Sequence, residues 1–488
     1  MWTESEPSCD GSADKGLSRR YLLNAVAGGW AGAALAALLD RESRGDAPKP
    51  HSPLGAKRPH FAAKAKAVIQ VFCPGGLSHV DTWDHKPELE RLHGQAFDAE
   101  LGKQTFAGIA GNYSKSFWAF RKHGQCGRAI SDLFPKLATH VDEMAFIHSM
   151  ANKSALHGPA MFMMNSGFIR PGFPSMGSWV TYGLGSENEN LPAFVALPDP
   201  RGLPPGGVAN WGAGFLPAAH QGTTIATAKG QAPIADLFPE RARPDAERAG
   251  REFLAKVNAA HAAARGDGLL EARIAAYELA ARLQLSAPEA LDLAKESAAV
   301  QKLYALEDPD VGPFGRQCLT ARRLVERGVR FVQVFCGAEN TSALKIRPNW
   351  DSHEDIRQDH GYWGRVLDVG AAALLVDLKS RGLLDSTLVI CASEFGRQPF
   401  MQGKQKGRDH NPGAFTAWLA GGGIKGGTTF GRSDDRGWQA VSPTYSYDLH
   451  ATALHLLGLD HEKLTFYQNG IPRRLTDVHG RVIREILA

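Results

Sequence analysis

The sequence predicts an α/β fold in which the strands of a mostly parallel sheet alternate with helices. Short apolar runs rich in β-branched residues, typical of strands buried on both faces, recur along the chain. Two of them, residues 329–336 and 388–391, flank an amphipathic helix expected at 361–381, and this order favours a parallel, right-handed crossover unit. Acidic and histidine residues follow three of the runs, as expected where open α/β sheets hold their ligands.

The remaining elements follow from the same patterns. Strands are also expected at 67–73, 144–147, 194–197 and 415–420. Helices are expected at 131–141, 161–164, 318–328 and 448–457. Residues 242–299 are rich in Ala, Leu, Glu and Arg at helical spacing and include a capping box at 286–289, so they predict an all-helical insertion.

The composition excludes some classes of protein. A chain of 488 residues can form one large domain with insertions or two domains, and 43% hydrophobic and 22% charged residues are ordinary for a globular protein. The net charge of +4 is small, and no basic stripe with interleaved aromatic residues is present, so we expect no nucleic-acid partner. The six cysteines lack zinc-type spacing, and five remain if the N-terminus is removed, so a disulfide framework is not expected.

The N-terminus resembles a twin-arginine export signal. Arg19 and Arg20 directly precede an apolar segment, residues 25–39, that is too short and too rich in Gly and Ala for a comfortable membrane span. We expect residues 1–40 to engage the twin-arginine export machinery, 41–66 to form a linker, and 67–488 to form a periplasmic or extracellular domain without a stable membrane span after signal removal. The alternative is a chance pair of arginines before a helix.

Three clusters of possible metal ligands follow predicted strands. They are His79, Asp81 and Asp84 after 67–73, Asp351 and His353 after 329–336, and Glu394 with Asp409 and His410 after 388–391. Mixed nitrogen and oxygen ligands suit Zn²⁺ or Mn²⁺ better than Ca²⁺. The pattern does not fix the number of metal ions. Arg397 and Arg408 stand beside the third cluster and could hold an anion bidentately. Each cluster could also be a hydrogen-bonded loop without a metal, and the metal hypothesis requires that the three clusters converge.

A further candidate site precedes Pro159. Proline suits the first turn of a helix, where its missing N–H costs nothing. Ser154 and His157 would then lie at a helix N-terminus, where unpaired N–H groups and the helix dipole attract anions.

Seven stretches resemble a known exported family: GGLSHVDTWDHKPEL, HGPAMFMMNSG, ARRLVERGVRFVQVF, WDSH, GLLDSTLVICASEFGR, GRDHNPGAF and DLHATALHLLGLDH. This family is known as a domain of unknown function, number fifteen hundred and one, and belongs to the alkaline phosphatase/sulfatase superfamily. The resemblance runs from about residue 67 to the C-terminus. It implies an alkaline phosphatase-like, three-layer α/β/α sandwich with a metal site at the C-terminal edge of the sheet, and the chemistry of phosphate or sulfate ester hydrolysis.

Two departures from the superfamily affect the expected mechanism. Where sulfatases carry a Cys- or Ser-x-Pro-x-Arg nucleophile motif, this chain has HGPAM at 157–161, which contains no formylglycine precursor. His157 is therefore expected to act as a ligand, a general base or a nucleophile, with Ser154 as a weaker alternative. The late strand ends in Ser393 and Glu394, where phosphatases usually have Asp-His, which leaves the number of metal ions open.

The expected function is an exported, metal-dependent hydrolase of phosphate or sulfate esters, in which a metal-activated water or His157 attacks the ester. Its partner would be an anionic ester, with sulfated or phosphorylated carbohydrates as one option. The alternative is a catalytically inactive protein on the same fold that binds anions or sulfated polysaccharides.

Overall fold

The computed structural model describes residues 54–97, 110–234, 244–265, 274, 289–339 and 349–488. The chain divides into two compact units, Met1–His51 with Asp245–Ala264, and Ser52–Pro244 with Arg265–Ala488. The predicted export signal and residues 41–53 of the predicted linker lie outside the described residues, as does the predicted capping box at 286–289 apart from Glu289 at its end. None of the helices in the described part of the chain combines the length and the apolar composition that a bilayer crossing requires.

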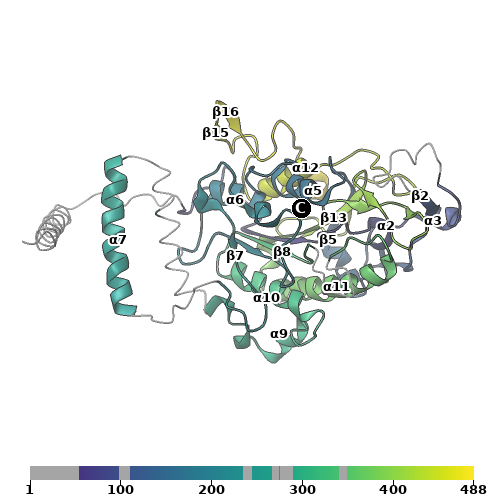
Figure 1. The fold of residues 1–488 in the computed structure, drawn as a ribbon, viewed down its shortest axis with the longest axis horizontal. Helices are drawn as coiled ribbons and strands as arrows, with labels where there is room; N and C mark the ends of the chain where they lie inside the picture. Colours follow the sequence, from purple (N-terminus) through teal and green to yellow (C-terminus); the bar gives the residue numbers. More distant parts are fainter. Residues whose placement is uncertain (1–53, 98–109, 235–243, 266–273, 275–288, 340–348) are drawn as a thin grey trace, which may run out of the picture. The chain divides into compact units, whose positions relative to one another are not determined.

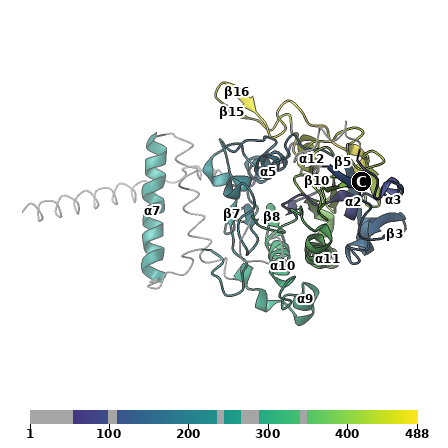
Figure 2. The ribbon, with the colours of Figure 1, turned by 45° about the vertical axis from the view of Figure 1, so that its right-hand side comes forward.

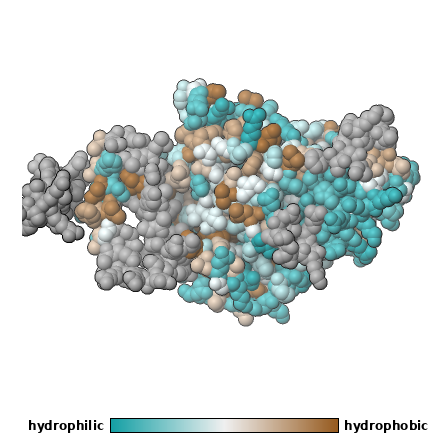
Figure 3. Space-filling view, viewed as in Figure 1, coloured by the Kyte–Doolittle hydropathy of each residue, from teal (hydrophilic) through white to brown (hydrophobic). Residues whose placement is uncertain are grey.

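The described residues of the smaller unit form helix α7 (Pro244–Arg265), which lies in the predicted helical insertion. This helix leaves three large apolar side chains exposed, those of Phe253, Leu254 and Val257. Figure 3 shows hydrophobic atoms on its surface.

An eight-stranded sheet forms the centre of the larger unit (Figure 1). Its order is β14-β5-β13-β9-β1-β8-β6-β7. The strands are β1 (Ala67–Phe72), β5 (Met144–Met150), β6 (Phe194–Leu197), β7 (Thr223–Thr224), β8 (Phe331–Phe335), β9 (Thr387–Ala392), β13 (Phe415–Ala420) and β14 (Thr428–Phe430). Every pairing is parallel except those of β13, which is antiparallel to both of its neighbours, β5 and β9. The mostly parallel sheet is therefore confirmed, and β1, β5, β8 and β9 end at the same edge.

Helices cover both faces of this sheet (Figures 1 and 2). Successive residues of β1 enter different cores, because side chains alternate along a strand: Ile69 and Val71 pack with α10 (Gly312–Glu326) and α11 (Ile356–Ser380). Val68 and Phe72 pack with α5 (His157–Ser166), α6 (Met176–Leu184) and α12 (Ser446–Leu456). These three layers confirm the predicted α/β/α sandwich.

Shorter elements surround the sandwich. The helices are α2 (His79–Thr82), α3 (Pro87–Leu92) and α9 (Ala298–Leu303). The strands form four antiparallel pairs: β2 (Ala110–Tyr113) with β11 (Phe400–Gln402), β3 (Phe120–His123) with β4 (Arg128–Ser131), β10 (Gly396–Arg397) with β12 (His410–Asn411), and β15 (Phe466–Gln468) with β16 (Ile471–Arg473).

The prediction of a helix at 131–141 is wrong. Residue 131 ends strand β4, and a 3-10 helix begins only at Leu137 and runs to Glu143. Pro135 accounts for the difference, since proline lacks the N–H that a helix interior needs and is tolerated only near the start of a helix.

Candidate metal centre

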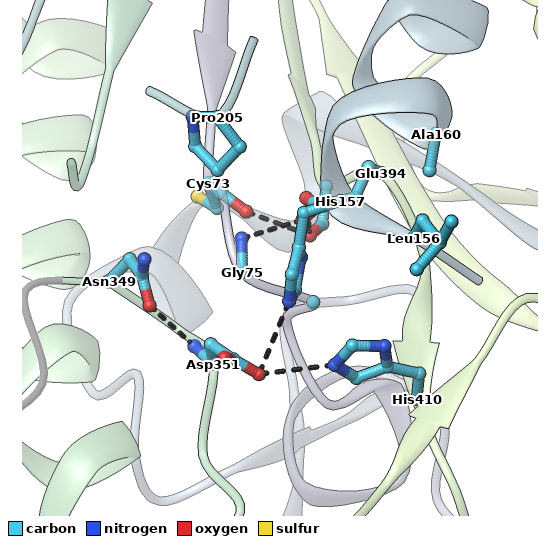
Figure 4. A network of polar contacts seen from close by, with 12 residues as sticks. Cys73, Gly75, Leu156, His157, Ala160, Pro205, Asn349, Asp351, Glu394 and His410 are labelled. Carbon is cyan, nitrogen blue, oxygen red and sulfur yellow. Dashed lines mark hydrogen bonds and ion pairs between the residues drawn. The ribbon is translucent and has the colours of Figure 1, made fainter. Parts of the chain in front are cut away.

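The segments that follow four parallel strands meet at the carboxyl edge of the sheet (Figure 4). Glu394 comes two residues after β9, and His157 is the first residue of α5, which follows β5. Asp351 lies in the segment after β8, which is fixed to the end of β1 because Trp350 N–H donates to Pro74 O at 3.0 Å. His410 belongs to the short strand β12. Residues more than 250 positions apart in the sequence therefore meet at one site.

Asp351 is the common partner of three histidines. Its Oδ1 lies 2.8 Å from His353 Nε2, 3.2 Å from His410 Nε2 and 3.3 Å from His157 Nε2. The Nε2 atoms of His353 and His410 are themselves 3.0 Å apart. Figure 4 shows His157 and His410 pointing toward Asp351. One carboxylate oxygen and three imidazole nitrogens thus face a single small volume.

The opposite ring nitrogen of each histidine contacts an acceptor. Nδ1 of His157 is 2.6 Å from Glu394 Oε1, Nδ1 of His410 is 2.7 Å from Ala155 O, and Nδ1 of His353 is 2.5 Å from Gln402 Oε1. A carboxylate and a carbonyl can only accept, so Nδ1 carries the proton in His157 and His410. In a neutral ring Nε2 then presents a lone pair toward Asp351. Metal-binding histidines are oriented in the same way, through an acceptor on the nitrogen away from the metal.

The spacing of these atoms fits a divalent cation. Ligands held about 2.0–2.1 Å from Zn²⁺ in a tetrahedron lie about 3.3 Å from one another, close to the observed 2.8–3.3 Å. His157, Asp351 and His410 form one group with donor atoms within 4.8 Å, and His353, Asp409 and His410 form another. His157 Nε2 is buried, and its 3.3 Å contact with Asp351 Oδ1 is an ion pair without the geometry of a hydrogen bond, so this nitrogen could also face a cation.

The charges around the site affect His157 and Asp351 in opposite directions. Burial alone would lower the pKa of His157, but its contacts with Asp351 and Glu394 outweigh burial and raise it to about 9. Burial alone would raise the pKa of Asp351, but Arg397 and the three histidines hold it well below its usual range. Asp351 is therefore charged at every physiological pH and can serve as an anionic ligand.

Glu394 is held rigidly behind His157. The residue is fully buried, and its Oε1 accepts from Gly75 N–H at 2.8 Å while Oε2 accepts from Ser393 Oγ at 3.0 Å. Gly75 has φ +109°, and a Cβ there would lie 2.4 Å from Asp351 N, so only glycine allows β1 to end this close to both carboxylates. Glu394 therefore lies behind the group around Asp351 and orients His157.

Replacement of Glu394 with glutamine is expected to weaken zinc binding about 10–100-fold, because an outer partner of a metal-binding histidine contributes this much to affinity. A competition titration against a chromophoric chelator measures the change. Glu462→Gln, at an exposed position, is the matched control and should bind zinc like the wild type. Equal affinity of the Glu394→Gln variant and the wild type would show that His157 is not oriented for a metal.

The two predicted anion-binding arginines are buried and point into protein. Arg397 donates to Gly75 O, to Gly76 O at 3.0 Å and to Arg408 O at 2.9 Å, and it pairs with Asp351 at 2.5 Å. Arg408 pairs with Asp81 at 2.8 Å, and both side chains are completely buried. The two arginines therefore do not form the expected anion-binding pair, because their guanidinium groups already donate to backbone carbonyls and carboxylates of the protein.

The first predicted cluster does not join the others. Asp81 accepts from Ser78 Oγ at 2.5 Å in addition to its pair with Arg408. His79 Nε2 lies 2.8 Å from Gly437 O, and burial lowers the pKa of this histidine. Of the predicted ligands, the structure thus brings together Asp351, His353, Asp409 and His410, places Glu394 behind His157, and leaves His79 and Asp81 apart.

Three supporting contacts were not predicted: Gln402 with His353, the carbonyl of Ala155 with His410, and Ser393 with Glu394. A backbone carbonyl has no sequence signature, and a single glutamine or serine in a loop is too common to indicate a site. Ser393 could have been found through its position between β9 and Glu394.

Comparison with known proteins identifies the family. The sequence profile of the family described as "Protein of unknown function (DUF1501)" matches residues 65–487. The chain belongs to this family. The resemblance stated from the sequence motifs is therefore confirmed, and the matched residues agree with its expected extent from about residue 67 to the C-terminus. No curated protein sequence matched the chain.

Several solved structures of low sequence identity are similar to this family member. The lipoteichoic acid synthase LtaP from Listeria monocytogenes has a TM-score of 0.36 and 10% identity, over 89% of this chain and 80% of that one. The PsFucS1 sulfatase from Pseudoalteromonas sp. has a TM-score of 0.32 and 14% identity, over 88% and 71%. The phosphonate monoester hydrolase SpPMH from Silicibacter pomeroyi has a TM-score of 0.30 and 13% identity, over 86% and 76%. The fold class itself rests on the strand order and the helical layers described above.

Proposed function

We propose that this protein is an exported hydrolase that uses a divalent metal ion to cleave phosphate or sulfate esters. The observation that carries the proposal is the convergence of His157, His353 and His410 on one oxygen of Asp351. Export is supported by the twin arginines at 19 and 20 and by the resemblance to an exported family.

Asp351, His353 and His410 would hold the ion, with Asp409 and His157 beside them. Nitrogen and oxygen donors of this kind favour Zn²⁺ or Mn²⁺ over Ca²⁺. When bound, such an ion supplies Lewis acidity to an ester oxygen or to water. Arg397 keeps Asp351 charged and in place, and it would therefore act as a positioning residue.

The N-terminus of α5 would bind the ester's anionic group. Leu156 occupies the N-cap and has no polar group to cap the helix, and Gly158 has open space where a side chain would lie. The first N–H groups of a helix lack partners within the helix, and they attract anions. Because His157 opens α5, an anion there would lie beside the metal ligands.

His157 would move the proton. Its Nδ1 is held by Glu394, so, where Asp351, His353 and His410 hold the ion, the Nε2 of deprotonated His157 is left uncoordinated and can accept a proton from the attacking water. A direct attack of Nε2 on the ester is the second route, and a covalent adduct on His157, detectable by mass spectrometry after acid-free quenching, would distinguish the two.

The test is hydrolysis of nitrophenyl phosphate, nitrophenyl sulfate and a panel of sugar sulfates by protein reconstituted with Zn²⁺ or Mn²⁺. We expect metal-dependent turnover of at least one ester, lost with a chelator and restored by the ion. Metal-loaded protein that hydrolyses the whole panel no faster than buffer would contradict the proposal and favour a non-catalytic, anion-binding role.

Metal affinity is expected to depend on pH. In the metal-free protein the pKa of His157 is about 9, so the ring is protonated at pH 7 and must lose its proton before Nε2 can face a cation. The apparent dissociation constant should therefore fall about tenfold per pH unit as pH rises toward 9, and then level off. Zinc titrations between pH 6.5 and 9.5 measure it, and a flat profile would show that His157 does not compete with the ion for a proton.

A further inference from the structure

A pocket of about 290 Å³ adjoins the candidate metal centre. His410 belongs to both, because its Nε2 faces Asp351 while its ring also lines the pocket. The other walls include Gln398, Asn411, Trp438, Gln439 and Tyr445. This volume lies just below the range for small-molecule sites, about 300–1,000 Å³, and fits a group the size of one ring.

The lining of the pocket is aromatic and amide-rich but uncharged. Among the described residues, no Asp, Glu, Lys or Arg lines it. Gln398 is 2% exposed, and its Oε1 has no hydrogen-bond partner within the described residues. A buried amide oxygen without a partner costs about 1–3 kcal/mol, which favours a ligand that donates a hydrogen bond there.

The wall that carries Trp438 and Gln439 is fixed by the first predicted cluster, which the metal centre does not use. His79 Nε2 is 2.8 Å from Gly437 O, and Asp84 accepts from Ser433 Oγ at 2.5 Å. Asp434 accepts from the N–H groups of Trp438 at 3.0 Å and Gln439 at 2.8 Å. The pocket is therefore preformed.

We propose that this pocket binds the sugar ring of a glycan ester, with the ester group directed past His410 to the metal centre. An uncharged wall of amides suits hydroxyl groups, and aromatic side chains suit the apolar face of a ring. This inference rests on the proposed function and names its substrate class. It also gives the His79 and Asp84 segment a role, which is to hold one wall of the substrate pocket.

The test measures binding of galactose, glucose, fucose and N-acetylglucosamine, each with and without sulfate, by saturation-transfer NMR and calorimetry. The variants are Gln398→Met, Gln439→Ala and Tyr445→Phe, with Gln221→Ala, an exposed glutamine outside the pocket, as control. We expect at least one sugar to bind the wild type and the control equally, and to bind Gln398→Met at least tenfold more weakly. If Gln398→Met does not fold, the variants at the exposed position 439 and the partly exposed position 445 test the proposal instead.

The two proposals fail differently. Sugar binding that weakens in the pocket variants and persists in Asp351→Asn supports the pocket, even if hydrolysis is never found. Metal-dependent hydrolysis of aryl esters with no sugar bound, or with equal sugar binding in wild type and pocket variants, overturns the pocket assignment and leaves the hydrolase proposal standing. The absence of both sugar binding and hydrolysis overturns both.

Discussion

Replacement of Asp351 with asparagine is expected to abolish metal binding and to lower ester hydrolysis more than about 100-fold. The effect should exceed the loss of about 10–100-fold that follows when a residue hydrogen-bonded to a metal ligand is changed, because Asp351 would itself be a ligand. Asp351 Oδ1 is the atom on which the three Nε2 atoms converge, so the change removes the carboxylate that contacts all three rings. Elemental analysis of the purified variant, together with turnover of the best substrate, measures both effects.

The control for this variant is Asp385→Asn. Asp385 is an exposed aspartate just before β9, at the end of the strand away from Glu394. It should retain the metal content and turnover of the wild type. Circular dichroism must show that Asp351→Asn is folded, since the change removes the carboxylate partner of buried Arg397. If the folded Asp351→Asn variant keeps its metal, Asp351 is not a ligand of the metal centre.

Replacement of Asp81 with asparagine is expected to destabilise the fold by about 3–5 kcal/mol, the cost of leaving one member of a buried ion pair without its partner. Asp81 and Arg408 are completely buried, and Arg408 also donates to Gln398 O and Ser114 O, so this pair joins segments from three parts of the chain. Urea unfolding followed by tryptophan fluorescence measures the loss.

Two comparisons show whether Asp81 is structural. Arg91→Met removes the exposed ion pair of Arg91 with Glu88 and should leave the unfolding midpoint close to that of the wild type. Folded Asp81→Asn at low temperature should retain its metal, because Asp81 lies outside the group around Asp351. If Asp81→Asn instead loses metal without losing stability, then Asp81 is a ligand and the placement of the first cluster is wrong.

The sequence predicted those parts of the fold and site that depend on local pattern. Buried apolar runs identified the central strands, and the position of Glu394 after β9 pointed to the edge of the sheet where the site lies. The antiparallel direction of β13 was not predicted. A parallel neighbour needs a crossover, usually helical, and residues 393–414, all of which are described, contain no helix.

The separation of Asp81 from Asp351 could not be read from local sequence. Both are acidic residues in segments that follow strands, and only the partner differs. Arg408, which neutralises Asp81, lies 327 positions away, whereas Asp351 meets imidazoles contributed by α5, β12 and its own loop. Residue type therefore identified candidates, and long-range packing decided which of them converge.

Anomalous X-ray diffraction at the zinc and manganese edges, on crystals of protein purified without added metal, tests the central claim most directly. We predict an anomalous peak about 2.0–2.2 Å from Asp351 Oδ1 and from the Nε2 atoms of His410 and at least one of His157 and His353. A site that stays without a peak after crystals are soaked in Zn²⁺ and Mn²⁺, or a peak elsewhere that does not touch Asp351, would contradict the account.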